Sequence, residues 1–215
     1  MNEWQSLGHT LAYLERADRI PHRAAGEAAL LEELPPSMRR VLDLGSGDGR
    51  LLQLALLARP EACGIALDFS PPMLDRLKER FAQDARVEIV GHDLSEVLPD
   101  LGSFDAVVSS FAIHHLEHPR KRQLYKEVWS ALEPGGVFCN LEHVASPTPR
   151  LHLRFLDAIG LTPEQEDSTN KLLDLETQLT WLREIGFADV DCHWKWRELA
   201  LLVGGKPGPA GSEVL

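Results

Sequence analysis

The segment from Val41 to Ala55, VLDLGSGDGRLLQLA, constrains the fold more than the rest of the sequence does. A short apolar run with the pattern of a buried strand leads into three glycines, Gly45, Gly47 and Gly49, and then into an amphipathic stretch typical of a helix. Glycines at a turn from strand to helix let a ligand approach the backbone closely, and the first turn of a helix offers free N–H groups. The segment therefore predicts a ligand-binding strand–loop–helix unit.

The spacing of these glycines indicates the class of ligand. A dinucleotide-binding loop reads G-x-G-x-x-G and directs its N–H groups and helix dipole at a pyrophosphate. Here the pattern is G-x-G-x-G, and Arg50 stands in place of the last glycine. Asp43 lies two residues before the first glycine, where its carboxylate would repel a pyrophosphate but attract a cation. This argues against a nucleotide-dependent oxidoreductase and favours a positively charged ligand.

Strand-like and helix-like segments alternate along most of the chain. The expected strands cover residues 39–46, 61–70, 87–94, 104–113, 136–144, 188–196 and 198–205, and the expected helices cover residues 21–34, 51–58, 71–84, 119–136 and 176–187. Such alternation is typical of a mainly parallel sheet covered by helices on both faces. The last two strands are joined by too few residues for anything but antiparallel pairing. We therefore predict an α/β fold with a doubly wound, seven-stranded sheet, mostly parallel with the last strand antiparallel.

Two further aspartates end the next expected strands, where ligands bind in open α/β sheets. Asp68 precedes Phe69 and Ser70, and Asp93 precedes Leu94. An acid at the end of the second strand can accept hydrogen bonds from both ribose hydroxyls. Asp68 could instead assist the start of the helix after Ser70, and Asp93 could form only a local turn with its own backbone.

Taken together and in order, these motifs resemble those of the class I S-adenosylmethionine-dependent methyltransferases. The resemblance covers residues 40–144 and includes SFDAVVSSFAIHHL, with Ser110 and Phe111 at the end of the fourth strand, and LEPGGVFCNLEHV before and along the fifth. It extends more loosely to the segment 186–205. The resemblance implies a Rossmann-like sheet, S-adenosylmethionine as the cofactor and methyl transfer as the activity.

The resemblance also implies roles for single residues. The glycine loop would surround the methionine part of the cofactor, Asp68 would bind the ribose, and Asp93 with the N–H of Leu94 would bind the adenine. Met73 would lie near the adenine or in the core, and Arg23 would meet the cofactor carboxylate or lie solvated on its helix. The expected cofactor-binding residues are Asp43, Gly45, Ser46, Gly47, Gly49, Asp68, Phe69, Ser70, Met73, Asp93, Leu94, Ser110, Phe111 and Arg23.

His114 and His115 follow the fourth expected strand and are the candidates for a catalytic base. A neutral imidazole accepts a proton at neutral pH, and methyl transfer needs a base only where the acceptor must lose a proton. One of the two could instead cap the following helix while the other packs. Glu142 and His143 end the fifth strand and border the same expected cavity. No compact set of metal ligands occurs in the sequence, so we expect no required metal ion.

The length and the net charge of the chain limit its domain organisation and its partners. The chain has 215 residues and a net charge of −11, so a phosphate backbone is repelled and a nucleic-acid partner is unlikely. No apolar run is long enough for a membrane span, and three scattered cysteines fit a reducing cytoplasm. We predict a single domain over 1–205, with an N-terminal helical segment (1–35), a lid insertion of short helices (145–176) and a flexible tail (206–215).

These observations favour a small molecule as the methyl acceptor. Two alternatives stay open. The segments IPHR and GFADVDCHWKW faintly resemble the carboxy-S-adenosylmethionine synthases of the tRNA wobble-uridine modification pathway, and a basic cluster that holds a carboxylated cofactor would favour that branch. The chain could also be a non-enzymatic S-adenosylmethionine-binding protein. The identity of the acceptor and the oligomeric state are not predicted from the sequence.

Overall fold

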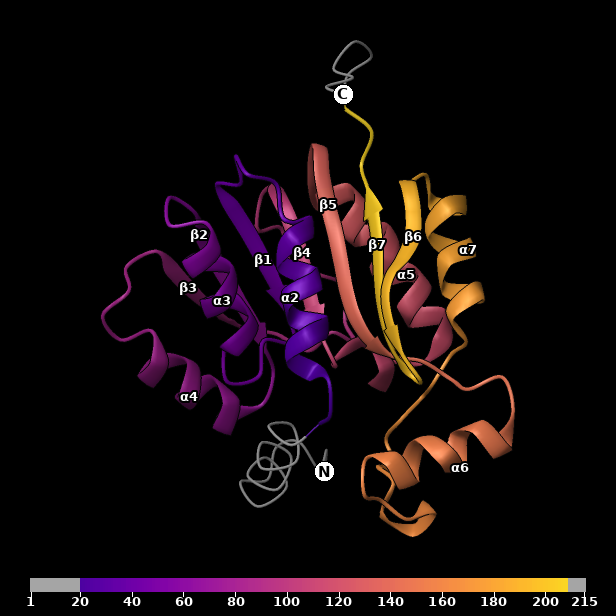
Figure 1. The fold of residues 1–215 in the computed structure, drawn as a ribbon. Helices are drawn as coiled ribbons and strands as arrows, with labels where there is room; N and C mark the ends of the chain where they lie inside the picture. The colour runs from indigo at the N-terminus through magenta and orange to yellow at the C-terminus, as the bar shows by residue number, and fades with distance from the viewer. Residues whose placement is uncertain (1–19, 209–215) are drawn as a thin grey trace.

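The computed structural model describes residues 20–208 and contains one seven-stranded sheet in the order β3-β2-β1-β4-β5-β7-β6 (Figure 1). The strands β1 to β5 run parallel to one another, whereas β7 pairs antiparallel with both β5 and β6. This confirms the predicted mostly parallel sheet and its terminal antiparallel hairpin. The strand bounds are β1 (Arg40–Leu44), β2 (Cys63–Asp68), β3 (Val87–Gly91), β4 (Phe104–Ser110), β5 (Leu132–His143), β6 (Ala188–Trp196) and β7 (Leu199–Gly205).

Helices cover both faces of the sheet, as predicted (Figure 1). One apolar layer includes Leu30, Leu52 and Leu77 from α2, α3 and α4, and the other includes Leu124 and Leu182 from α5 and α7. The short helices α6 and η3 belong to the segment 145–176. The helix bounds are α2 (Arg23–Glu33), α3 (Arg50–Ala58), α4 (Pro71–Arg80), η2 (Ile113–His115), α5 (His118–Ala131), α6 (Pro149–Ala158), η3 (Pro163–Gln165) and α7 (Leu175–Ile185).

Strand β1 is an interior strand of the sheet and fixes the position of the site. It pairs with β2 on one side and β4 on the other, so the chain crosses over in opposite directions from this point. Such a switch point opens a crevice at the carboxyl ends of the strands. Figure 1 shows α6 beyond that same end of the sheet. Loops that follow β1, β2, β4 and β5 therefore converge on one edge.

The junction of α5 and β5 differs from the sequence-based expectation. The helix ends at Ala131 rather than at the Pro-Gly-Gly turn, and the strand begins at Leu132. Gly135 adopts a left-handed backbone, and its N–H donates to the carbonyl of Lys206 at 2.8 Å, while the Lys206 N–H donates to Gly136 at 2.8 Å. The Pro-Gly-Gly segment therefore extends the sheet and binds the first residue of the predicted tail.

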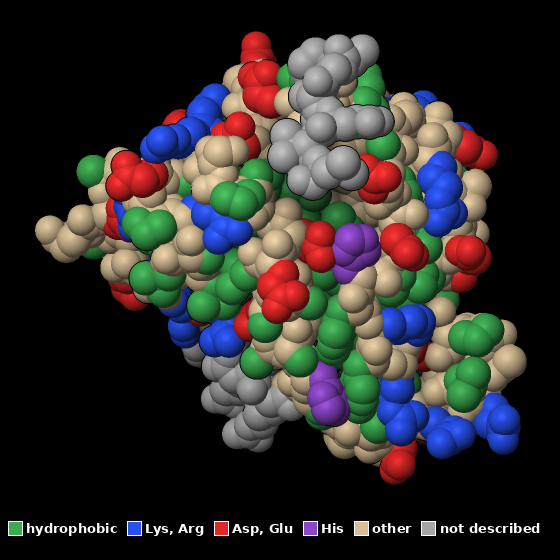
Figure 2. All heavy atoms as spheres, turned by 45° about the horizontal axis from the view of Figure 1, so that its top comes forward, with side chains coloured by type: hydrophobic (Ala, Val, Ile, Leu, Met, Phe, Trp, Pro, Cys, Tyr) green, Lys and Arg blue, Asp and Glu red, His purple; other side chains and the backbone are tan. Residues whose placement is uncertain are grey.

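The predicted terminal segments lie partly outside the described residues. Helix α2 falls within the expected N-terminal helical segment, but residues 1–19 and 209–215 are not described. Within residues 20–208, no helix combines the length and the apolar character that a membrane crossing requires. On the face shown in Figure 2, acidic and basic side chains are interspersed.

Candidate active site

The glycine loop after β1 contains three left-handed residues, Gly45, Gly47 and Gly49, with φ of 67°, 57° and 83°. A Cβ on Gly45 would lie 2.3 Å from the Cβ of Ala112, and one on Gly49 would lie 2.6 Å from the Phe81 ring, so close packing requires both glycines. Gly47 differs, because a Cβ there would have no atom within 4 Å. Its backbone faces open space that a ligand can occupy.

Ser46 fastens this loop to the tip of β2. Its hydroxyl donates to the carbonyl of Asp43 at 2.8 Å and accepts from the N–H of Leu67 at 2.9 Å. The Ser46 N–H donates to the Leu67 carbonyl at 2.9 Å, and the Gly47 N–H donates to the Asp68 carboxylate at 2.8 Å. The role of Ser46 is therefore to hold the loop, and its hydroxyl has little capacity left for a ligand.

Asp43 is almost completely buried, with 1% of its surface exposed, and neither carboxylate oxygen has a hydrogen-bond partner among the described residues. Burial raises the pKa of Asp43 from 3.8 to about 7, and the nearby Asp68 charge adds to the rise. The side chain borders a cavity of about 30 Å³ together with Arg23 and Ser110, whose hydroxyl is also buried without a partner. A buried carboxylate without donors is suited to a cation.

A larger cavity of about 400 Å³ adjoins this small one, and Gly45 and Gly47 line both. In it, the carboxylates of Asp68 and Asp93 each accept one backbone N–H two residues further on, at 2.9 Å. Both aspartates therefore stabilise a local turn and also line the cavity. The predicted residues that line the larger cavity are Gly45, Gly47, Asp68, Phe69, Ser70, Met73, Asp93, Leu94 and Phe111.

The remaining predicted residues are placed differently. Arg23, Asp43, Ser46 and Ser110 line the small cavity. Gly49 lines neither cavity. The absence of a side chain at this position instead allows α4 to pack closely against the loop. The structure therefore brings thirteen of the fourteen expected cofactor-binding residues to two adjoining cavities.

Sequence reasoning missed the role of Glu27. This carboxylate is 2% exposed and pairs with Arg50 at 2.8 Å and with Arg23 at 2.9 Å. Arg50 and Arg23 line the small cavity, so Glu27 fixes two guanidinium groups beside Asp43. The only available signal was Arg50 itself, which stands where a dinucleotide-binding loop has its last glycine.

A further cavity of about 120 Å³ lies beside the larger one, and Phe111 and His115 line both. Three imidazoles, those of His114, His115 and His143, face it. Its other lining residues come mainly from the segment 145–176, which the sequence predicts as a lid: Phe155, Leu156, Ile159, Leu161, Glu166, Asp167 and Asn170. We refer to this space as the acceptor cavity.

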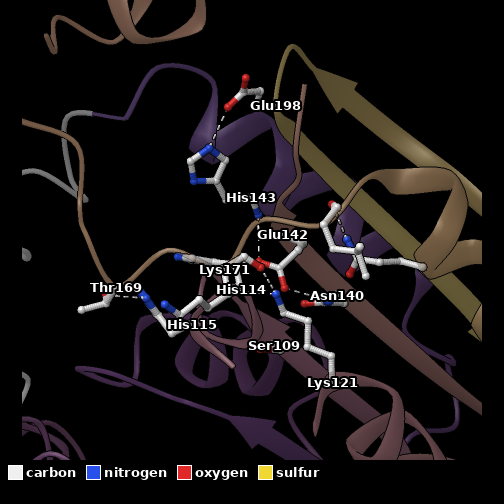
Figure 3. Close-up of polar contacts among 12 residues, drawn as sticks. Ser109, His114, His115, Lys121, Asn140, Glu142, His143, Thr169, Lys171 and Glu198 are labelled. Carbon is white, nitrogen blue, oxygen red and sulfur yellow. Dashed lines mark hydrogen bonds and ion pairs between the residues drawn. The ribbon is translucent and has the colours of Figure 1, made fainter. Parts of the chain in front are cut away.

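His114 and Glu142 form a buried pair at one wall of the acceptor cavity (Figure 3). His114 Nδ1 lies 2.8 Å from Glu142 Oε1, and the carboxylate also accepts from the His143 N–H and the Asn140 amide. Burial holds the pKa of His114 well below 6.5, so the ring is neutral at neutral pH. Burial also lowers the pKa of His115 to about 3, and its Nδ1 lies 2.9 Å from the Thr169 hydroxyl.

Sequence reasoning also missed Glu198, a fully buried carboxylate between β6 and β7. It pairs with His143 on the sheet at 3.0 Å and with His152 on α6 at 3.1 Å. His152 also contacts Glu166 at 3.1 Å. Burial alone would lower the pKa of His152, but the two carboxylates outweigh it and raise the pKa. His152 thus joins the segment 145–176 to the sheet.

Lys121 joins the same segment, 145–176, to α5. Its buried ammonium donates to the carbonyl of His114 at 3.2 Å and to the carbonyl of Lys171. The Lys171 N–H also donates to the His114 carbonyl, at 2.9 Å. The loop that carries His114 is therefore held from two directions. Within residues 20–208, no three His, Cys, Asp or Glu side chains are placed to hold a metal ion.

Comparison with known proteins decides the family. A family model described as a methyltransferase domain matches residues 41–136. A demethylmenaquinone methyltransferase from Clavibacter sepedonicus is 34% identical over 172 residues, which cover 73% of this chain and 69% of that protein. The chain is a class I S-adenosylmethionine-dependent methyltransferase. The resemblance in the motifs is thereby confirmed, and so is S-adenosylmethionine as the cofactor.

Two further relatives of the methyltransferase are informative. A carboxy-S-adenosylmethionine synthase from Helicobacter hepaticus is 25% identical over 193 residues, which cover 82% of this chain and 80% of that protein. The structure of an O-methyltransferase family protein from Burkholderia thailandensis matches with a TM-score of 0.76 and 19% identity over 95% of this chain. The methyltransferase spans only 62% of the length of that structure, so the likeness concerns the shared fold.

We predict that Gly47→Ala weakens binding of S-adenosylhomocysteine by about tenfold or more, because a methyl group would enter the space next to the loop backbone. Gly135→Ala is the matched control, since Gly135 also has a positive φ and nothing within 4 Å of a new Cβ, but lies far from the cavities. Both variants should lose similar stability in urea. Equal affinity of the two variants in calorimetric titrations would contradict the loop as a ligand contact.

We also predict that Asp43→Asn abolishes S-adenosylhomocysteine binding but stabilises the ligand-free protein at pH 8. The folded pKa of Asp43 is raised to about 7, so its contribution to stability falls as the pH rises from about 4 to about 7. The full cost is roughly 4 kcal/mol, and asparagine removes it. The gain in melting temperature of the variant over wild type should therefore be larger at pH 8 than at pH 5. A gain that is independent of pH would contradict the buried, titrating carboxylate.

Proposed function

We propose that the methyltransferase transfers the methyl group of S-adenosylmethionine to a small molecule held in the acceptor cavity. The observation that carries this proposal is the contact between the two cavities. Phe111 and His115 line both, so a methyl group at this boundary is within reach of a molecule in the acceptor cavity. Holding two reactants side by side is the main contribution a protein makes to such a transfer.

The residues present fit the cofactor. Asp43 is a buried carboxylate without a partner, as a site for the ammonium or sulfonium charge requires, and Arg23 beside it can pair with the cofactor carboxylate. The carboxylate of Asp68 would bind the ribose hydroxyls, and Asp93 with Leu94 would bind the adenine edge. When bound, S-adenosylmethionine supplies a methyl group that its sulfonium makes electrophilic.

The pair of His114 and Glu142 supports a proton-accepting role. With Glu142 ionised, Nδ1 of His114 would carry the hydrogen and Nε2 would carry the free lone pair. The ring lines the acceptor cavity, and the carboxylate stabilises the imidazolium that forms when Nε2 takes a proton. His115 is held by Thr169 and lines both cavities, which places it to orient the acceptor.

A small acceptor is supported by the shape of the cavity. The segment 145–176 contributes more than half of its lining, and the space of about 120 Å³ has the size of a small molecule. Glu166 and Asp167 add negative charge to this lining, which would repel a phosphate backbone. The lid role of this segment is part of the proposal.

A carboxy-S-adenosylmethionine synthase is the second candidate, because such a protein matches 82% of the chain. That reaction needs a basic group to hold the new carboxylate on the cofactor. In the described residues, the acceptor cavity has no lysine or arginine in its lining, and the larger cavity has Lys171 alone. The geometry therefore supports methyl transfer better.

Fractionation of the products tests the proposal. The protein is incubated with a bacterial lysate and S-adenosylmethionine labelled with tritium in the methyl group, and products are separated into a small-molecule filtrate and an RNA and protein retentate. We predict new label in the filtrate, and none above background with Asp43→Asn. Label in the retentate, or a carboxylated cofactor in the mass spectrum of the filtrate, would contradict the proposed acceptor or reaction.

We predict that His114→Ala lowers kcat roughly 100-fold without changing the affinity for S-adenosylhomocysteine, because the base is lost while the cofactor cavity stays intact. Glu142→Gln should lower kcat less and shift the pH profile, because the amide stabilises the imidazolium poorly. His118→Ala, outside both cavities, is the control. Full activity of the His114→Ala and His115→Ala variants and of the double variant would exclude a histidine base.

A further inference from the structure

Building on the proposed function, we propose that the acceptor is a molecule of about one ring that carries a hydroxyl group and no anionic group. The acceptor cavity combines three features that define this class. These are a small apolar volume, two carboxylates from the segment 145–176, which we call its cover, and a histidine oriented to take a proton.

The volume sets the size. The acceptor cavity holds about 120 Å³, and an apolar cavity of about 150 Å³ accommodates benzene in another protein. One ring therefore fills the space, and a second fused ring would require the cover to move. The walls favour a flat apolar body, since most of them are aliphatic or aromatic: Ile20, Phe111, Phe155, Leu156, Ile159, Leu161 and Leu199.

The charges around the cavity exclude an anion. Glu166 and Asp167 line the cover, and Glu142 lies directly behind His114. A carboxylate or phosphate on the acceptor would lose its hydration without gaining a cation, which is strongly unfavourable. Lys121 is the nearby buried ammonium, but two backbone carbonyls already occupy it.

A second positive group near the cover is also occupied. His152 lies between Glu166 and Glu198, and its raised pKa reflects these two carboxylates. It joins the lid segment to the sheet and does not line the acceptor cavity. The acceptor cavity therefore offers a neutral or cationic molecule a compatible environment and offers an anion none.

The hydroxyl group follows from His114. Its Nε2 lone pair is an acceptor, so it orients a donor such as O–H rather than a C=O group. In the transfer, the O–H bond breaks and its proton passes to Nε2. The oxygen lone pair forms the bond to the methyl carbon, and the bond from carbon to sulfur breaks with its electron pair passing to sulfur. The products are a methyl ether, S-adenosylhomocysteine and a protonated His114.

Three phenols of the same ring size test this inference. Tyrosol is neutral, tyramine is cationic, and 4-hydroxyphenylacetate is anionic at pH 7. Binding of each to the complex with S-adenosylhomocysteine is measured by calorimetry, and turnover is measured as S-adenosylhomocysteine release from S-adenosylmethionine. We expect tyrosol and tyramine to bind about tenfold or more tightly than 4-hydroxyphenylacetate.

Variants show whether the cover causes this order. The double variant Glu166→Gln, Asp167→Asn keeps the hydrogen-bond acceptors of the cover but removes its charges, so the preference against 4-hydroxyphenylacetate should shrink several-fold. Glu164→Gln is the control, because Glu164 is exposed in the adjacent short helix η3 and lines neither cavity. It should leave the preference unchanged.

The outcomes separate this inference from the function on which it rests. Equal or tighter binding of 4-hydroxyphenylacetate, or binding of none of the three phenols, would overturn the acceptor class. In that case S-adenosylhomocysteine binding and methylation of a molecule from the lysate filtrate would leave the proposed function intact. Absence of S-adenosylhomocysteine binding would instead overturn the proposed function.

Discussion

The unpaired carboxylate of Asp43 is the feature on which the rest of the site depends. Keeping it charged in the folded protein costs roughly 4 kcal/mol, since burial raises its pKa from 3.8 to about 7. The sheet can bear this cost because β1 is an interior strand, with four of five residues buried and neighbours paired on both sides. Ser46 locks the adjoining loop to β2. The fold thus holds in place a charge that a cationic ligand would compensate.

The features that depend on short stretches of sequence were predictable. Gly45 and Asp43 lie in one strand–loop–helix unit, and the alternation of elements fixed the parallel sheet that brings Asp68 and Asp93 to the same edge. The position of each aspartate at the end of its own strand was enough to predict that the two lie together, because the carboxyl ends of parallel strands meet at one edge of the sheet. The exception is Gly49, which the motif includes but which packing against α4 explains.

The features that depend on distant pairs were not predictable. Glu142 is 28 residues from His114, and Glu198 is 55 residues from His143. These contacts follow from strand register and from the turn between β6 and β7, neither of which composition or periodicity specifies. Glu27 likewise reaches Arg50 only because α2 packs beside α3. Sequence patterns located the strand ends, whereas the pairing of side chains across them required coordinates.

Burial acts in opposite directions in the two cavities, and both directions suit methyl transfer. It raises the pKa of Asp43, so a cation next to that group restores the charge that burial disfavours. It lowers the pKa of His114, so the ring is neutral and able to accept a proton before the reaction. In the proposed reaction, a proton taken up by His114 would place the new positive charge 2.8 Å from Glu142. The proposed reaction would therefore form its new positive charge beside a carboxylate that is already in place.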